Sequence, residues 1–200
     1  MAEDSVDRKR RNLLWGVASG LGAAGAAAAV IPFVSAMQPA ADTLAAAVTE
    51  FDVSTVEPGM MKTIAWRGQP VFIMHRTPEM LKLLHGHDNL LRDPLSRAIP
   101  EVRADWMMTH EQRVTRAIKP EYLVISGVCT HLGCIPTFKP TPGRQDWGDS
   151  VPKGWPGGWH CACHGSYYDL SGRVFRHVPA PYNLYIPPYK YVSGATILIG

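Results

Sequence analysis

The feature that most constrains this chain is the placement of its cysteines. All four lie in two short boxes, and each box also carries a histidine: Cys129-Thr130-His131-Leu132-Gly133-Cys134 and Cys161-Ala162-Cys163-His164-Gly165-Ser166. Thiolates and imidazoles bind metals, and short Cys/His spacings of this kind are typical of metal sites. The chain must therefore fold so that these two segments meet.

The two boxes support two interpretations. In Rieske-type [2Fe–2S] centres, two histidines replace two cysteines on one of the irons, and each box offers one thiolate and one imidazole. The ligands would then be Cys129, His131, Cys161 and His164. The sulfurs of Cys134 and Cys163 are left over, and an exported compartment would allow them to form a disulfide. The alternative is a structural zinc ion bound by all four cysteines.

An uncharged run of 25 residues, 13–37, follows the basic cluster Arg8–Arg11. A bilayer core needs about 20 apolar residues, whereas a cleavable signal has an apolar region of roughly 7–15. The positive-inside rule places the basic cluster in the cytoplasm. We therefore expect a cytoplasmic tail at 1–12, a retained transmembrane anchor at 13–37 and a neck at 38–48, for which composition leaves a flexible hinge and a passive spacer equally open. Cleavage after Ala36 is the alternative to retention.

The segment Arg10-Arg11-Asn12-Leu13-Leu14 resembles a twin-arginine export signal. That route carries folded proteins, so a cluster inserted in the cytoplasm could be exported with its domain. A plain charge cluster that only sets topology is the alternative. The formal net charge of +3 is too small to predict a nucleic-acid partner.

Residues 49–200 are expected to form one mainly β domain, because 17 prolines and 18 glycines predict many turns. Strand patterns cover 60–66, 71–74 and 122–128, and hairpins are expected around 171–172 and 193–194. Thr77-Pro78 predicts the start of a short helix. Residues 135–158 hold five prolines and are expected to be loop.

At its two boxes the chain resembles the bacterial Rieske iron–sulfur subunit of the cytochrome bc1 complex. CTHLGC and CxCHGSxYD are specific in combination, and the match extends to Gln69–Thr77, Val178–Pro181 and the N-terminal anchor. The resemblance covers nearly the whole chain, disfavours zinc and favours a flexible hinge at 38–48. It implies a single transmembrane helix followed by a Rieske-type antiparallel β-sandwich at 49–200. A small cluster-binding subdomain at about 126–182, one short helix and a long loop complete that expectation.

The resemblance also assigns roles by position. Cys129 and Cys161 would bind the buried iron, and His131 and His164 the outer iron of one [2Fe–2S] cluster. The two histidines, above all His164, would also take part in catalysis.

Five further positions receive roles by the same resemblance. Cys134 and Cys163 would form a disulfide. Ser166 would donate a hydrogen bond to a bridging sulfide and Tyr168 one to the sulfur of the first cysteine ligand, which raises the reduction potential. Leu132 would shield the cluster between the histidines.

The implied function is electron transfer in a respiratory quinol–cytochrome c oxidoreductase. The cluster would take one electron from ubiquinol at cytochrome b, with a proton going to a ligand histidine, and pass the electron to cytochrome c1. The complex would be a dimeric, multi-subunit translocase of the bacterial inner membrane, with the cluster domain in the periplasm. The alternative is the Rieske subunit of another exported oxidoreductase, such as arsenite oxidase.

Overall fold

The computed structural model describes residues 7–38, 47–98, 106–143, 151–152 and 154–200. Its contacts divide the chain into two units near residue 44. Half of the predicted tail and most of the predicted neck, at 1–6 and 39–46, lie outside the described residues.

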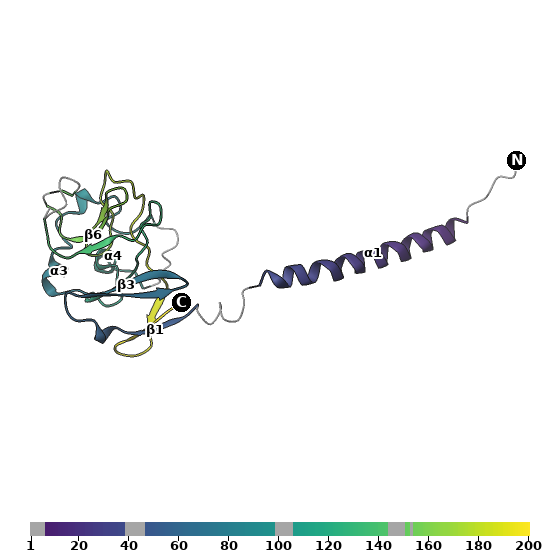
Figure 1. The fold of residues 1–200 in the computed structure, drawn as a ribbon, viewed down its shortest axis with the longest axis horizontal. Helices are drawn as coiled ribbons and strands as arrows, with labels where there is room; N and C mark the ends of the chain where they lie inside the picture. The colour runs from purple at the N-terminus through teal and green to yellow at the C-terminus, as the bar shows by residue number, and fades with distance from the viewer. Residues whose placement is uncertain (1–6, 39–46, 99–105, 144–150, 153) are drawn as a thin grey trace. The chain divides into compact units, whose positions relative to one another are not determined.

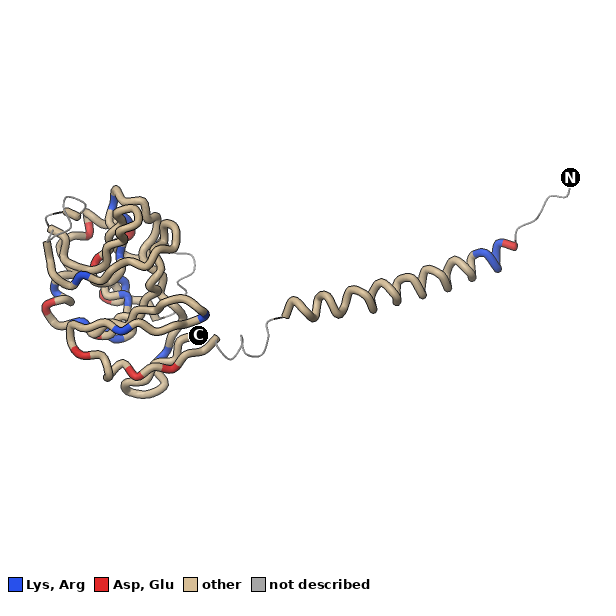
Figure 2. The backbone as a smooth tube through the Cα atoms, in the orientation of Figure 1, with Lys and Arg blue, Asp and Glu red and all other residues tan. Residues whose placement is uncertain are grey.

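The first unit contains the helix α1, Arg8–Ala36 (Figure 1). The carboxylate of Asp7 caps it by accepting the backbone N–H groups of Lys9 and Arg10 at 3.0 and 3.3 Å. Charged residues lie only at its beginning (Figure 2), and the helix is long and apolar enough to cross a bilayer. The predicted anchor is therefore helical, and the helix begins at the basic cluster rather than at Leu13.

The described part of the second unit contains three three-stranded antiparallel sheets, with strand orders β1-β9-β8, β2-β3-β4 and β5-β6-β7. The first is built from β1 (Thr49–Asp52), β8 (Tyr189–Tyr191) and β9 (Thr196–Ile199). The second is built from β2 (Met61–Trp66), β3 (Gln69–His75) and β4 (Tyr122–Ser126). The third is built from β5 (Thr137–Lys139), β6 (Gly158–Cys161) and β7 (Ser166–Tyr168). The prediction of a mainly β domain is confirmed.

Local sequence signals account for several of these elements. The β2–β3 hairpin turns at Arg67 and Gly68, both with positive φ (49° and 73°), as a two-residue type I′ turn requires. The hydroxyl of Thr77 caps α3 (Pro78–Lys82), as predicted. A second short helix, α4 (His110–Thr115), begins at a capping box made by Thr109 and Gln112. Single 3-10 turns lie at Val53–Thr55 (η1) and Asp88–Leu90 (η2).

Two local predictions need correction. The segment 135–158 is not all loop, because β5 lies within it and pairs with β6. The hairpin expected around 171–172 is reduced to one bridge between Tyr168 and Val174. There the carboxylate of Asp169 accepts the N–H groups of Ser171 and Arg173 at 2.9 and 2.8 Å, so that side chain shapes the turn instead of strand pairing.

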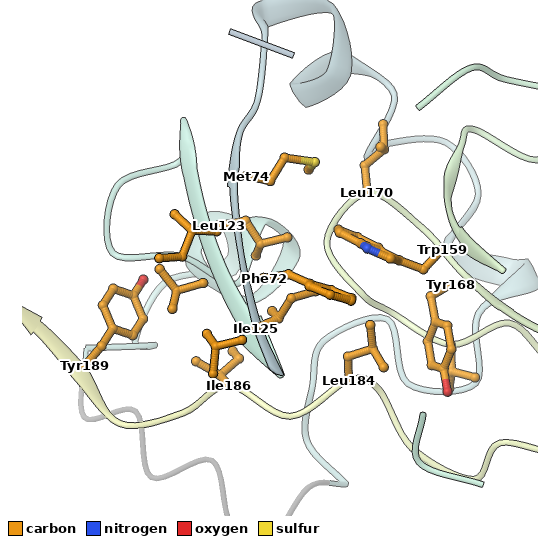
Figure 3. Packing of buried hydrophobic residues seen from close by; sticks show 14 of the residues in the cluster. Phe72, Met74, Leu123, Ile125, Trp159, Tyr168, Leu170, Leu184, Ile186 and Tyr189 are labelled. Atoms are coloured by element: carbon orange, nitrogen blue, oxygen red, sulfur yellow. The ribbon is translucent and has the colours of Figure 1, made fainter. Parts of the chain in front are cut away.

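The hydrophobic core connects the second sheet to the third. The four residues 71–74 of the central strand β3 are all buried. Figure 3 shows the ring of Phe72 directed toward Trp159 of β6, and the two rings stack with 6.2 Å between their centroids. Phe138 of β5 packs on the same indole, with 5.3 Å between the ring centroids. Because Trp159 stands two residues before Cys161, this packing fixes the strand that leads into the second box.

A network of buried charges includes residues of the turn that follows β7. The Nε of Arg173 donates to the carboxylate of Asp169 at 2.7 Å, and both side chains are fully buried. The Nε2 of His87 lies 3.2 Å from the same carboxylate. Two further arginines, Arg76 and Arg116, are also fully buried. Their guanidinium groups donate mainly to backbone carbonyls of distant segments, at Thr115, Pro120, Ser171 and Leu184.

Candidate iron–sulfur site

Each box is a tight loop at the end of a strand. The first follows β4 and is closed by hydrogen bonds from Cys129 N to the carbonyl of Cys134 (2.8 Å) and from Gly133 N to the carbonyl of Cys129 (3.0 Å). The second forms the turn of the β6–β7 hairpin, where Cys161 pairs with Ser166. The loops need their glycines, because Gly133 and Gly165 have φ of 84° and 74°.

The structure brings the four predicted ligands together in pairs. Cys129 and Cys161 are free thiols, each only 2 % exposed. Burial raises the pKa of the Cys161 thiol, and a hydrogen bond with Cys129 raises it further. The rings of His131 and His164 meet edge to face with 4.7 Å between their centroids. His164 is exposed and His131 half-buried, so the histidine pair lies nearer the solvent than the cysteine pair.

A disulfide joins the two boxes. It connects Cys134 to Cys163, whose Cα atoms are 6.7 Å apart and which are separated by 29 positions in the chain. The Sγ of Cys161 lies within 4.8 Å of both disulfide sulfurs. Sulfurs in a disulfide are not thiolate ligands, so this geometry leaves two thiolates and argues against a zinc ion bound by four cysteines.

Several groups at the site have bonding capacity that no described residue is seen to use. A bound cluster could use it. The Nδ1 of His131 is buried and has no hydrogen-bond partner among the described residues. The hydroxyl of the fully buried Ser166 accepts the N–H of Ala180 at 3.0 Å, so its own hydrogen remains available to another acceptor. Buried polar groups are normally satisfied. Two free thiols, an unpartnered imidazole nitrogen and this hydroxyl fit an iron–sulfur cluster with anionic sulfides.

The phenol of Tyr168 lies beside the first cysteine. Its hydroxyl is 3.2 Å from the Sγ of Cys129 and also accepts the N–H of Thr130 at 3.3 Å. Burial, followed by the hydrogen bond with Cys129, raises the pKa of Tyr168 far above its usual value. The hydroxyl therefore stays protonated and is placed to donate to the Cys129 sulfur.

Leu132 is 71 % exposed, as is expected for a residue at the tip of the first box. Its predicted shielding of the cluster between the histidines remains a prediction. Ile135, 63 % exposed, is a second large apolar side chain beside this box that sequence reasoning did not single out.

Sequence reasoning also missed Thr130 as a structural link. Its hydroxyl donates to the carbonyl of Tyr182 at 2.6 Å and so ties the first box to the residues that follow the Val178–Pro181 loop. The only signal was its position between two predicted ligands, and position alone does not reveal a contact with a residue 52 positions away.

Comparisons with known proteins identify the family. Residues 1–40 match the family model described as the ubiquinol–cytochrome c reductase Fe–S subunit TAT signal, which confirms the export-signal prediction. Residues 99–190 match the Rieske [2Fe–2S] domain.

The chain is 47 % identical over its whole length to the ubiquinol–cytochrome c reductase iron–sulfur subunit of Allochromatium vinosum, of which it covers 92 %. It is 45 % identical over 97 % of its length to the subunit of the same name from Rhodospirillum rubrum, of which it covers 93 %. A solved chain titled Hyperthermophilic respiratory Complex III aligns over 90 % of this chain and 96 % of its own length, with 25 % identity and a TM-score of 0.47. On the two sequence relatives and the family models, the chain belongs to the Rieske [2Fe–2S] iron–sulfur subunits of bacterial ubiquinol–cytochrome c reductase.

Proposed function

We propose that this chain is the subunit that carries electrons from ubiquinol, oxidised at cytochrome b, to cytochrome c1. The observation that carries the proposal is the pairing of two buried free thiols with two facing imidazoles on loops joined by a disulfide. We assign Cys129 and Cys161 to the inner iron and His131 and His164 to the outer iron. A Rieske cluster so bound is a one-electron carrier with a potential of about −150 to +300 mV.

The remaining groups have distinct tasks in this proposal. Tyr168 donates to the Cys129 sulfur and Ser166 to a sulfide, and both bonds favour the reduced, electron-rich state. The exposed imidazole of His164 accepts the quinol hydrogen bond and takes the quinol proton as the electron leaves the quinol. An imidazole suits this task because one ring nitrogen can bind iron while the other exchanges a hydrogen bond or a proton with the quinol.

The same proposal places the chain in the bacterial inner membrane, within a dimeric, multi-subunit translocase. The tail at 1–12 would be cytoplasmic, α1 would span the bilayer, and the domain from residue 49 would lie in the periplasm. The match to a twin-arginine signal and the apolar helix support export with a retained anchor. The basic residues at the start of the helix support this orientation.

One experiment tests the function directly. The full chain, expressed in its membrane and gently solubilised, is expected to show a Rieske EPR signal on reduction and to co-purify with b-type and c-type haem. A chain holding zinc gives no such signal, and a Rieske subunit of arsenite oxidase co-purifies with molybdenum and without b-type haem. Either result would overturn the proposal.

The neck at 38–48 is proposed as a hinge that lets the domain move between its donor and its acceptor. Alanine-to-proline substitutions at 45–47 should slow quinol oxidation severalfold, because proline stiffens a linker. The EPR signal should stay unchanged. Alanine-to-serine substitutions at the same three positions keep small, flexible residues and serve as the control. Turnover that is equal in the proline and serine variants would contradict the hinge.

A further inference from the structure

The segment between the two boxes holds a tryptophan that contacts the site from behind. Trp155 is 1 % exposed, and its indole Nε1 donates to the backbone carbonyl of Tyr168 at 3.0 Å. The hydroxyl of the same tyrosine lies 3.2 Å from the Sγ of Cys129. One residue therefore separates the indole from a sulfur assigned as a cluster ligand.

Trp155 is itself held firmly. Its backbone N–H donates to the carbonyl of Pro152 at 3.0 Å, and its carbonyl accepts the N–H of Gly143 at 2.9 Å. Its side chain belongs to a small hydrophobic cluster, separate from the main core, against which Tyr167 also packs. The buried members of that cluster are Leu91, Val151, Trp155 and Phe175. The folded ends of the inter-box segment thus form a scaffold behind β7.

Tyr168 has little freedom at the end that Trp155 contacts. Its carbonyl also lies against Gly158, so closely that a Cβ at that glycine would overlap the oxygen. Its ring is fully buried, and Figure 3 places it at the end of the core beyond Trp159. A shift of this backbone would therefore be carried by a rigid ring to the hydroxyl at its far end.

We propose that Trp155 is a positioning residue, whose hydrogen bond to the Tyr168 carbonyl fixes the distance between the Tyr168 hydroxyl and the Cys129 sulfur. The inter-box segment thereby helps to set the reduction potential of the site. The proposal rests on the proposed function, since it needs a cluster whose potential responds to this hydroxyl.

The test compares three variants of the full chain by redox titration followed by EPR and by thermal unfolding. Trp155→Phe removes the donor and keeps an aromatic ring. Trp66→Phe is the matched control, because that indole also donates to a backbone carbonyl, that of Ala47 at 2.7 Å, but it lies on β2, outside the two boxes. Tyr168→Phe removes the hydroxyl itself. We expect Trp155→Phe to lower the potential, by less than Tyr168→Phe does, and to shift the EPR g-values, whereas Trp66→Phe should keep the wild-type potential.

The double variant Trp155→Phe/Tyr168→Phe shows whether the indole affects the potential through the Tyr168 hydroxyl. If the indole acts through the hydroxyl, the double variant has the potential of Tyr168→Phe alone. A further shift in the double variant would overturn the proposal, as would a wild-type potential in Trp155→Phe or an equal shift in Trp66→Phe.

A second replacement covers the case in which Trp155→Phe does not accumulate. β-(3-Benzothienyl)alanine at position 155 keeps the shape of tryptophan and lacks the N–H, and the same outcomes apply. A wild-type chain with no Rieske signal would instead contradict the proposed function, so the two failures are distinguishable.

Discussion

Replacing Arg173 with methionine is expected to lower the free energy of unfolding by about 3–5 kcal/mol at neutral pH, the usual effect of stranding a buried charge. The guanidinium is fully buried and donates to Asp169 at 2.7 Å and to Asp88 at 3.1 Å. Without it, the carboxylate of Asp169 keeps His87 and two backbone N–H groups as partners but loses its nearest permanent positive charge. Chemical unfolding of the full chain in detergent measures the loss.

The pH dependence of this loss provides a second test. Burial by itself raises the pKa of Asp169, but Arg173 and then His87 outweigh it and hold that pKa well below its usual range. A depressed carboxyl pKa stabilises the fold above the unfolded pKa, and that stability is lost only as pH falls through the folded pKa. In Arg173→Met, the pKa of Asp169 should rise, because its nearest permanent positive charge is gone. The difference from wild type should therefore be largest near pH 7 and should shrink below about pH 4.

Two controls separate the stranded charge from the lost side chain. Arg176→Met removes an exposed arginine three residues away, whose Nε donates to the carbonyl of Leu91, and should cost about 1 kcal/mol or less. Adding Asp169→Asn to Arg173→Met removes the stranded charge and should recover part of the loss. A loss equal to that of Arg176→Met would contradict the prediction.

The parts of the fold that sequence predicts well depend on local chemistry. The boxes follow from ligand types at fixed spacing, the apolar helix from the absence of charge over 13–37, and the cap at Thr77 from one hydroxyl before a proline. Each of these signals is complete within a few neighbouring residues. The helix α4 also had such a signal in its capping box at Thr109, but its six residues are too few to show a helical period.

The parts that sequence does not predict depend on partners far along the chain. Arginine is almost never fully buried unless it is paired, so nothing local predicts that Arg76, Arg116 and Arg173 lie inside. The prolines of the inter-box segment correctly indicate turns, yet they conceal that β5 pairs with β6 and that Trp155 reaches the carbonyl of Tyr168. The site is therefore predictable as a set of ligands, whereas the scaffold behind it is not.

The double variant Cys134→Ser/Cys163→Ser is expected to lose most of its cluster and nearly all quinol oxidation, although it keeps both free thiols and both histidines. The disulfide closes a loop of 29 positions, and removing such a cross-link costs roughly 3–4 kcal/mol in the chain-entropy model. The boxes carry only a few backbone hydrogen bonds of their own, so much of that cost should appear as loosening of the ligand loops. Iron content per chain and the amplitude of the EPR signal measure the loss.

A matched control and a ligand variant bracket this result. Ala162→Ser adds a hydroxyl at an exposed position between the two cysteines of the second box, keeps the disulfide and should retain the cluster. Cys161→Ser removes an assigned ligand and should give no Rieske signal at any temperature. The disulfide variant should lie between them and should lose iron faster on warming, because its ligands are present but poorly held. A disulfide variant with the iron content and unfolding midpoint of Ala162→Ser would show that the loops hold their shape unaided, and the role assigned to Cys134 and Cys163 would then be wrong.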